Sequence, residues 1–275
     1  MMENEIESEF IRDINRVITE MVESIKLYLT AIEFIDSYDD HDAMNFMDWL
    51  SLCGNIESVS VSIDMHDSST FWCRPAYEYE KEKSYQLSVI CRELTRFQFA
   101  CLALESLMRY YNLKAKKGKG LTIVLAEYYG GQKALEGIRK QLEGAFQLTM
   151  KEFQRDIYFT KDLEDVEKKI REYKIDGLAQ GILLVYKLRN GFAHGTLEII
   201  SQFSNIDEEE DPNIDSIILS CLIVLLNIIA LLLTDELSNE IISECSDLEE
   251  YEGKSGKAYL TDVAKKANCV LSIQE

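Results

Sequence analysis

The sequence has few of the residues that interrupt helices. Only two prolines occur among 275 residues, and the 13 glycines are scattered along the chain. The apolar residues recur mostly at every third or fourth position, which is the spacing of a helix face and not of a strand. We therefore exclude a many-stranded sheet and predict an all-α fold. Because 47% of the residues are hydrophobic, the helices have enough apolar surface to bury a sizeable core.

Positive charge is also scarce. The chain has 29 Lys and Arg residues against 49 Asp and Glu residues, which gives a formal net charge of −20. An electrostatic field of this sign repels nucleic acids and anionic membranes. Any function that involves RNA therefore needs a local concentration of positive charge, or an oligomer or partner protein that presents the RNA.

Signals for metal binding, disulfides and secretion are absent. None of the seven cysteines forms a CxxC pair, so we expect reduced thiols, no metal site and no cofactor. The fragments GKGLT and GKSGK lack the glycine spacing of a phosphate-binding loop. The N-terminal residues MMENEIESEF are acidic, whereas a secretory signal begins with a basic segment. These features favour a cytoplasmic protein.

One long hydrophobic run is present, IILSCLIVLLNIIALLL at residues 217–233. It falls just short of the roughly 20 residues that span a bilayer. Three small or polar residues interrupt it, and its acidic flanks contain no basic anchor. A helix that is apolar on all sides also fits the centre of a soluble bundle. We predict such a central helix and no membrane contact, with a membrane span as the alternative.

Apolar periodicity predicts the order of the helices. They are expected within residues 4–36, at 44–53, from shortly after Pro75 to about 111, and at 121–129, 131–153, 161–173, 176–194, 213–243 and 258–270. The stretch SVSVSIDMH at 58–66 alternates like a strand but also fits a helix, so both interpretations stay open.

Three regions follow from these segments. Pro75 marks the first boundary, because the residue before a proline is pushed out of helical conformation. We predict an N-terminal helical region at 1–75, a helical core at 76–236 and a C-terminal extension at 237–275.

The stretch LRNGFAHGT at 188–196 contains one of only three histidines, five places after an arginine. It ends a predicted helix that carries Arg189, Asn190 and His194, with Gly195 as a C-terminal cap. On a straight helix, residues five apart point about 140° away from each other. The two side chains then meet only if the arginine wraps around the helix or the backbone loosens at Gly191. The structural alternative is a histidine that favours a helix C-terminus beside a solvated arginine.

The residues RNGFAH resemble the Arg-polar-x-x-x-His signature of the HEPN family, at the end of an apolar helix that precedes a very apolar one. The segment LTRFQFACLALESLM at 94–108 is similar to the long early helix of the HEPN subgroup that includes Apea-like proteins. The resemblance covers roughly residues 80–235. It implies a HEPN-type helical bundle, here with additional N-terminal helices, that is usually a homodimer and cleaves RNA without a metal.

The chemistry of this activity suits the three residues. A ribose 2′-hydroxyl attacks the adjacent phosphate when a base accepts its proton, and imidazole titrates near neutral pH, so His194 would be the base or the acid. Arg189 would stabilise the phosphorane through paired hydrogen bonds. Asn190 would position the phosphate or orient the other two side chains. The resemblance implies a 2′,3′-cyclic phosphate as the product.

Two weaker candidates complete the predicted site. Glu105 lies among apolar neighbours in the middle of a helix, where it either orients the arginine or lies at the surface. The densest positive charge in the chain is a group of lysines in a glycine-containing loop, which either contacts RNA phosphates or is solvated. These lysines are Lys114, Lys116, Lys117 and Lys119.

The resemblance therefore implies a cytoplasmic, metal-independent HEPN endoribonuclease that serves as a toxin or effector in stress or antiviral defence, together with a regulatory or antitoxin protein. Some HEPN toxins carry a tyrosine two residues beyond the histidine, where adenylate is attached, and this chain has Thr196 there. The alternative is a non-catalytic HEPN-like interaction or regulatory module. The net charge of −20 favours the module, whereas the intact Arg189, Asn190 and His194 favour the nuclease.

Overall fold

A computed structural model describes residues 9–31, 41–62, 74–115, 120–130, 149–150, 160–175, 177–194, 214–236, 246–251, 254, 258–263 and 265–266. Within these residues all regular structure is helical, which confirms the all-α prediction. The elements are α1 (Glu9–Ala31), α2 (His41–Asn55), α3 (Arg74–Tyr110), α4 (Leu121–Gly130), α6 (Thr160–Tyr173), α7 (Gly177–Ala193), α8 (Ile214–Glu236) and the 3₁₀ helix η7 (Ser246–Tyr251). Residues 258–263 are also helical.

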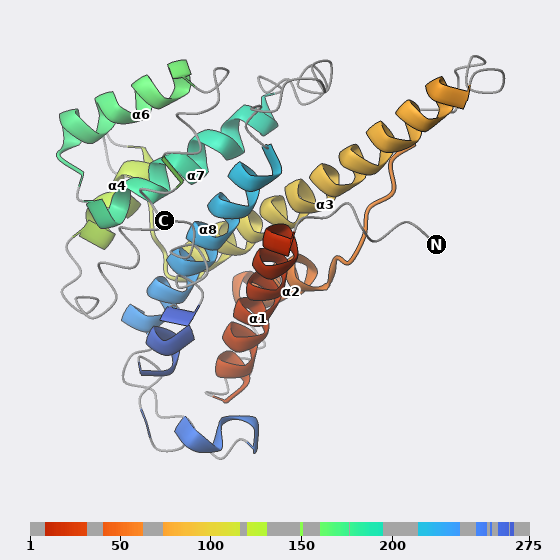
Figure 1. Cartoon of the computed structure of the whole chain (residues 1–275). Coiled ribbons are helices and arrows are strands. Elements are labelled where there is room, and N and C mark those ends of the chain that lie inside the picture. Colours follow the sequence, from red (N-terminus) through yellow and green to blue (C-terminus); the bar gives the residue numbers. More distant parts are fainter. Residues whose placement is uncertain are drawn as a thin grey trace.

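The helix α8 occupies the centre of the bundle (Figure 1). Every residue from Ile217 to Leu233 is buried, and α1, α3 and α7 pack against the helix. The amide of Asn227, buried within this apolar run, donates from Nδ2 to the backbone oxygen of Ile223 at 2.9 Å, so the polar side chain is accommodated inside the core. The predicted buried central helix is confirmed. Among the described residues, no helix combines the length and the apolar character needed to cross a bilayer.

The helix α3 forms a long axis beside α8. Its first part, through Gln86, contains no buried residue and extends beyond the other helices (Figure 1). From Leu87 onward, buried side chains recur on the face that packs along α2 and α8. Pro75 is the second residue of the helix, where its missing N–H would have no helical acceptor in any case. The helix therefore begins just before the proline and not after it.

A backbone cap ends α3. Asn112 adopts a left-handed conformation with φ 54°. Its N–H donates to the oxygen of Arg109, and the N–H of Leu113 donates to the oxygen of Met108, each at 2.8 Å. This is the Schellman pattern of hydrogen bonds, and asparagine tolerates the left-handed conformation better than most residues. The cap turns the chain so that Leu113 packs against the core.

The region after α2 corrects two sequence predictions. The helix continues through Gly54 to Asn55. Gly54 lies against α1, where a Cβ atom would be 2.6 Å from Cγ1 of Val22, so the glycine permits the close approach of the two helices. Residues 56–62 have no regular secondary structure, so the strand and helix interpretations are both wrong for 58–62, while 63–66 lie outside the described residues. It lies against α3, where the N–H of Val61 donates to Oγ of Ser88 at 2.9 Å. The predicted helix at 131–153 lies outside the described residues except for 149–150.

The N-terminal and later helices share one hydrophobic core. Ile18 of α1, Phe46 of α2, Phe97 of α3 and Leu225 of α8 belong to the same cluster of buried side chains. Tyr259, in the predicted C-terminal extension, belongs to it as well. The division of the chain at residues 75 and 236 stays a prediction, although the described parts of the three regions are packed together.

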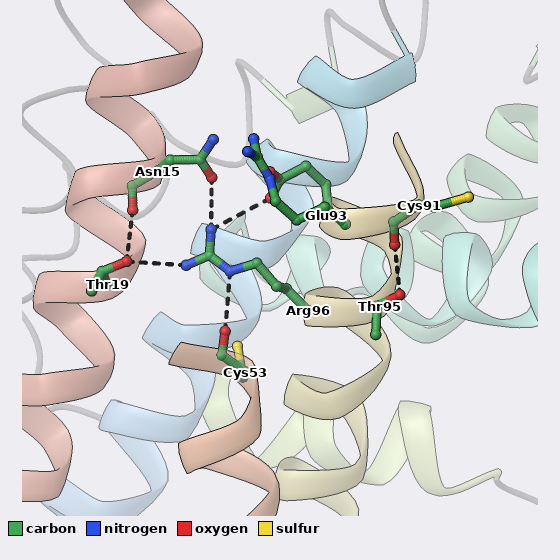
Figure 2. Close-up of polar contacts among 8 residues, drawn as sticks. Asn15, Thr19, Cys53, Cys91, Glu93, Thr95 and Arg96 are labelled. Carbon is green, nitrogen blue, oxygen red and sulfur yellow. Dashed lines mark hydrogen bonds and ion pairs between the residues drawn. The ribbon is translucent and has the colours of Figure 1, made fainter. Parts of the chain in front are cut away.

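Arg96 forms a buried polar centre that joins α1, α2 and α3 (Figure 2). Its Nη1 donates to Oδ1 of Asn15 at 2.7 Å, and its Nη2 donates to Oγ1 of Thr19 at 3.2 Å, both on α1. Its Nε donates to the backbone oxygen of Cys53 at 3.0 Å. That oxygen belongs to the last turn of α2, where a positive charge also interacts favourably with the helix dipole.

Glu93, one turn before Arg96, is the buried countercharge. It is fully buried, and its Oε2 lies 3.6 Å from Nη1 of Arg96. Its Oε1 accepts a hydrogen bond from Nε of Arg92 at 2.6 Å. Oε2 has no hydrogen-bond donor among the described residues, so Arg96 is the countercharge that compensates the burial of this oxygen, as Arg92 does for Oε1.

We predict that the Arg96→Met substitution lowers the free energy of unfolding by about 3–5 kcal/mol, because it leaves Oε2 of the buried Glu93 carboxylate without a countercharge, and Arg92 then contacts only Oε1. The measurement is urea unfolding followed by circular dichroism. The double variant Arg96→Met, Glu93→Met removes both charges and should recover most of the loss. If the single and double variants were equally unstable, the electrostatic account of this centre would be wrong.

Candidate functional site at the end of α7

The predicted site residues lie at the C-terminal end of α7. Arg189 and Asn190 belong to the helix, and His194 is the first residue after it. The N–H of His194 donates to the oxygen of Asn190 at 3.0 Å, so helical hydrogen bonding continues past Gly191. The backbone therefore does not loosen at Gly191, which was one of the two conditions for convergence. The predicted cap, Gly195, lies outside the described residues.

Burial divides this end of α7 into a packed side and a solvent side. Leu188 and Gly191 are buried. Asn190, Ala193 and His194 are exposed, and Arg189 and Phe192 are partly exposed. At about 100° per residue, the four polar or small positions Arg189, Asn190, Ala193 and His194 fall within one sector of about 140°, and the partly buried Phe192 lies outside it on the packed side of Arg189. Arg189 and His194 therefore border the same solvent-exposed sector, and the small side chain of Ala193 leaves the space between them open.

A carboxylate from α3 holds the guanidinium. Nη2 of Arg189 donates to Oε1 of Glu105 at 3.0 Å, and Nη1 donates to Oδ1 of Asn190 at 3.2 Å. The side chains of Arg189 and Glu105 are 32% and 26% exposed, so the ion pair is open to water and to a ligand. The two hydrogen bonds fix the guanidinium at the surface. It lies at the edge of the solvent-exposed sector, and Asn190 lies within that sector.

Two residues that the sequence interpretation did not include lie behind this ion pair. Tyr186 precedes Arg189 by one turn of α7, and Cys101 precedes Glu105 by one turn of α3. Burial raises the pKa of each, and the charge of Glu105 raises it further while Arg189 lowers it. The hydroxyl of Tyr186 donates to Sδ of Met108 at 3.7 Å. Both groups therefore stay neutral and form a packed support. Tyr186 lies three residues before Arg189 and Cys101 four residues before Glu105, so each shares a helix face with a predicted site residue. This spacing could have indicated both residues from the sequence.

The buried thiols do not form a reactive centre. Burial raises the pKa of Cys53 to about 12, despite an opposing effect of Arg96, and it raises the pKa of Cys221 as well. Such thiols are protonated at neutral pH and are weak nucleophiles. Within the described part of the chain, no cluster of His, Cys, Asp and Glu residues could hold a metal ion.

The predicted lysine group is described only in part. Lys114 is exposed and follows the cap of α3. Lys116, Lys117 and Lys119 lie outside the described residues. The structure therefore does not bring these lysines together with Arg189, and their contact with RNA stays a prediction.

Comparison with known proteins yields no match among family models, curated proteins or solved structures. The HEPN resemblance consequently depends on the motif and on its helical setting.

We predict that Glu105→Ala changes the free energy of unfolding by less than about 1 kcal/mol, because ion pairs that are open to solvent contribute little to stability. The measurement is the same urea titration, with Arg96→Met as the comparison for a buried pair. A loss of stability as large as that caused by Arg96→Met would show that the pair of Glu105 and Arg189 is a structural element and not part of an accessible site.

Proposed function

We propose that this chain is a metal-independent endoribonuclease of the HEPN type, in which Arg189, Asn190 and His194 act on a phosphodiester of RNA. The observation that carries the proposal is the exposed sector at the end of α7. It combines a guanidinium anchored by Glu105, an amide beside it and an exposed imidazole. A fully solvated arginine would lack such an anchor, and a histidine that served only packing would be buried.

The residues divide the reaction between them. The imidazole of His194 accepts the proton of the ribose 2′-hydroxyl while the 2′-oxygen forms a bond to phosphorus. The bond from phosphorus to the 5′-oxygen then breaks, and an imidazolium returns a proton to the leaving 5′-oxygen. Arg189 donates hydrogen bonds to the phosphorane, which carries more negative charge than the ground state. The products are a 2′,3′-cyclic phosphate and a 5′-hydroxyl.

Glu105 acts as a positioning residue in this proposal. A free arginine side chain samples many rotamers, and an ion pair with a neighbouring helix restricts them before the substrate binds. The same carboxylate also repels a phosphate, so it must hold the guanidinium from one side only. The single contact through Oε1 and the exposure of Arg189 are consistent with this arrangement.

Two copies of the chain would complete the site. At about 1.5 Å of rise per residue, the Cα atoms of Arg189 and His194 are separated by about 7.5 Å along the helix axis and lie on opposite edges of the sector. Because Glu105 and Asn190 hold the guanidinium on its own edge, the imidazole that meets it would come from a second copy in a twofold dimer. The defence role, the cytoplasmic location and a regulatory or antitoxin partner belong to the proposal through the family resemblance.

The test is cleavage of mixed RNA in the presence of a metal chelator. We expect wild-type cleavage that ends in a 2′,3′-cyclic phosphate, and a loss of at least about 100-fold for Arg189→Ala and for His194→Ala. Arg171→Ala is the matched control, because Arg171 is an exposed arginine on α6 that pairs with Glu167. Circular dichroism should show unchanged helicity for all three variants.

Conservative variants separate positioning from folding in the same assay. Glu105→Gln keeps an acceptor for Arg189 and should retain more activity than Glu105→Ala, whereas Arg189→Lys should remain nearly inactive because lysine lacks the paired donors. Wild-type activity no higher than that of the variants would contradict the nuclease. That result would favour the interaction module.

A further inference from the structure

A hollow lies at the junction between the end of α3 and the start of α4. It has a volume of about 520 Å³, which falls in the range of small-molecule sites. Its lining includes the apolar side chains of Leu113, Leu121, Val124 and Leu125. Val124, Leu113 and Leu121 remain partly exposed. The hollow therefore offers apolar surface that remains accessible between residues 112–115 and α4.

Polar groups surround this apolar surface. Lys114 and Glu127, both exposed, belong to the lining. Lys114 is also the first of the lysines that make 114–119 the densest positive stretch of the sequence. The occupant that fits is a flat, largely apolar group with hydrogen-bonding edges and a nearby negative charge. A nucleobase with its phosphate has this combination, since the base can be buried while a lysine meets the phosphate.

The position of the hollow relates it to the candidate site. α3 ends at Tyr110, five residues and about 7.5 Å along its axis beyond Glu105, and Asn112 at the edge of the hollow belongs to the cap that follows. The Schellman cap at Asn112 determines where the chain turns after α3. It therefore determines the position of the hollow with respect to the end of this helix. A single strand of RNA whose phosphodiester lay at Arg189 could reach this distance with a neighbouring nucleotide.

We propose that this hollow is a base-binding subsite, which takes one unstacked nucleobase of the single-stranded RNA substrate near the bond that is cleaved. The proposal rests on the proposed nuclease function and gives it a substrate class, because a base can enter the hollow only from an unpaired strand. Glu127 accepts hydrogen bonds and does not donate them, so a base with an exocyclic amino group fits its edge better than uracil does.

The experiment measures binding of a short, fluorescein-labelled single-stranded RNA to the full chain with His194→Ala, which prevents cleavage. Fluorescence anisotropy is recorded for the intact RNA and for a set in which each position in turn is abasic. We expect one abasic position to weaken binding about tenfold, which is the effect of removing one well-buried base. Val124→Trp fills the hollow. In this variant, the abasic position should no longer weaken binding, and intact RNA should bind about tenfold more weakly than it binds to the protein without this substitution.

Thr122→Trp is the matched control. Thr122 is partly exposed on the same helix but does not line the hollow, so this variant should keep the dependence on the base. Equal binding of all abasic RNAs, or an undiminished dependence in Val124→Trp, would overturn the subsite while wild-type cleavage left the nuclease intact. Absence of both RNA binding and wild-type cleavage would overturn the subsite together with the proposed function.

Discussion

The bundle is organised by one constraint, the need to cover α8 on every side. A helix that is apolar all round leaves no face that water can solvate favourably, so neighbouring helices must enclose it. In this chain, α1, α3 and α7 pack against α8, and Ile217–Leu233 is buried throughout. This enclosure sets α3 and α7 on the same core and leads to the contact between Glu105 and Arg189. The site is therefore a consequence of how the core is closed.

Two arginine–glutamate pairs, each with its glutamate on α3, have different roles because their exposure differs. The pair of Arg96 and Glu93 is buried, and the guanidinium connects three helices through fixed acceptors. Desolvation makes such a pair costly to break and gives it little freedom to meet a ligand. The pair of Arg189 and Glu105 is about one third exposed at the arginine. It contributes little to folding but presents a charge that a phosphate can reach.

The sequence predicted the positions of most helices and missed features that depend on contacts between helices. α4, α6 and α7 begin and end within one residue of the predicted positions, since the spacing of apolar residues in α6 and the polar or glycine-containing segments that flank the helices are local signals. The unstructured stretch at 56–62 was misread because alternating Val and Ser residues fit more than one structure, and its bond to Ser88 is a long-range contact. The sequence identified Glu105 as a possible partner of Arg189, but the exposed sector required the burial pattern of α7. The buried Arg96 could not be recognised, because its acceptors lie on three separate helices.

The central claim is that a guanidinium and an imidazole from two copies of the chain meet at one phosphodiester. Mixing equal amounts of the inactive Arg189→Ala and His194→Ala chains, under conditions that allow subunit exchange, tests it most directly. The account predicts a return to about a quarter of wild-type cleavage, because half of the dimers are mixed and each of these has one intact site of two. If the mixture stayed as inactive as its components although mixed dimers were detected, a site shared between two copies would be contradicted.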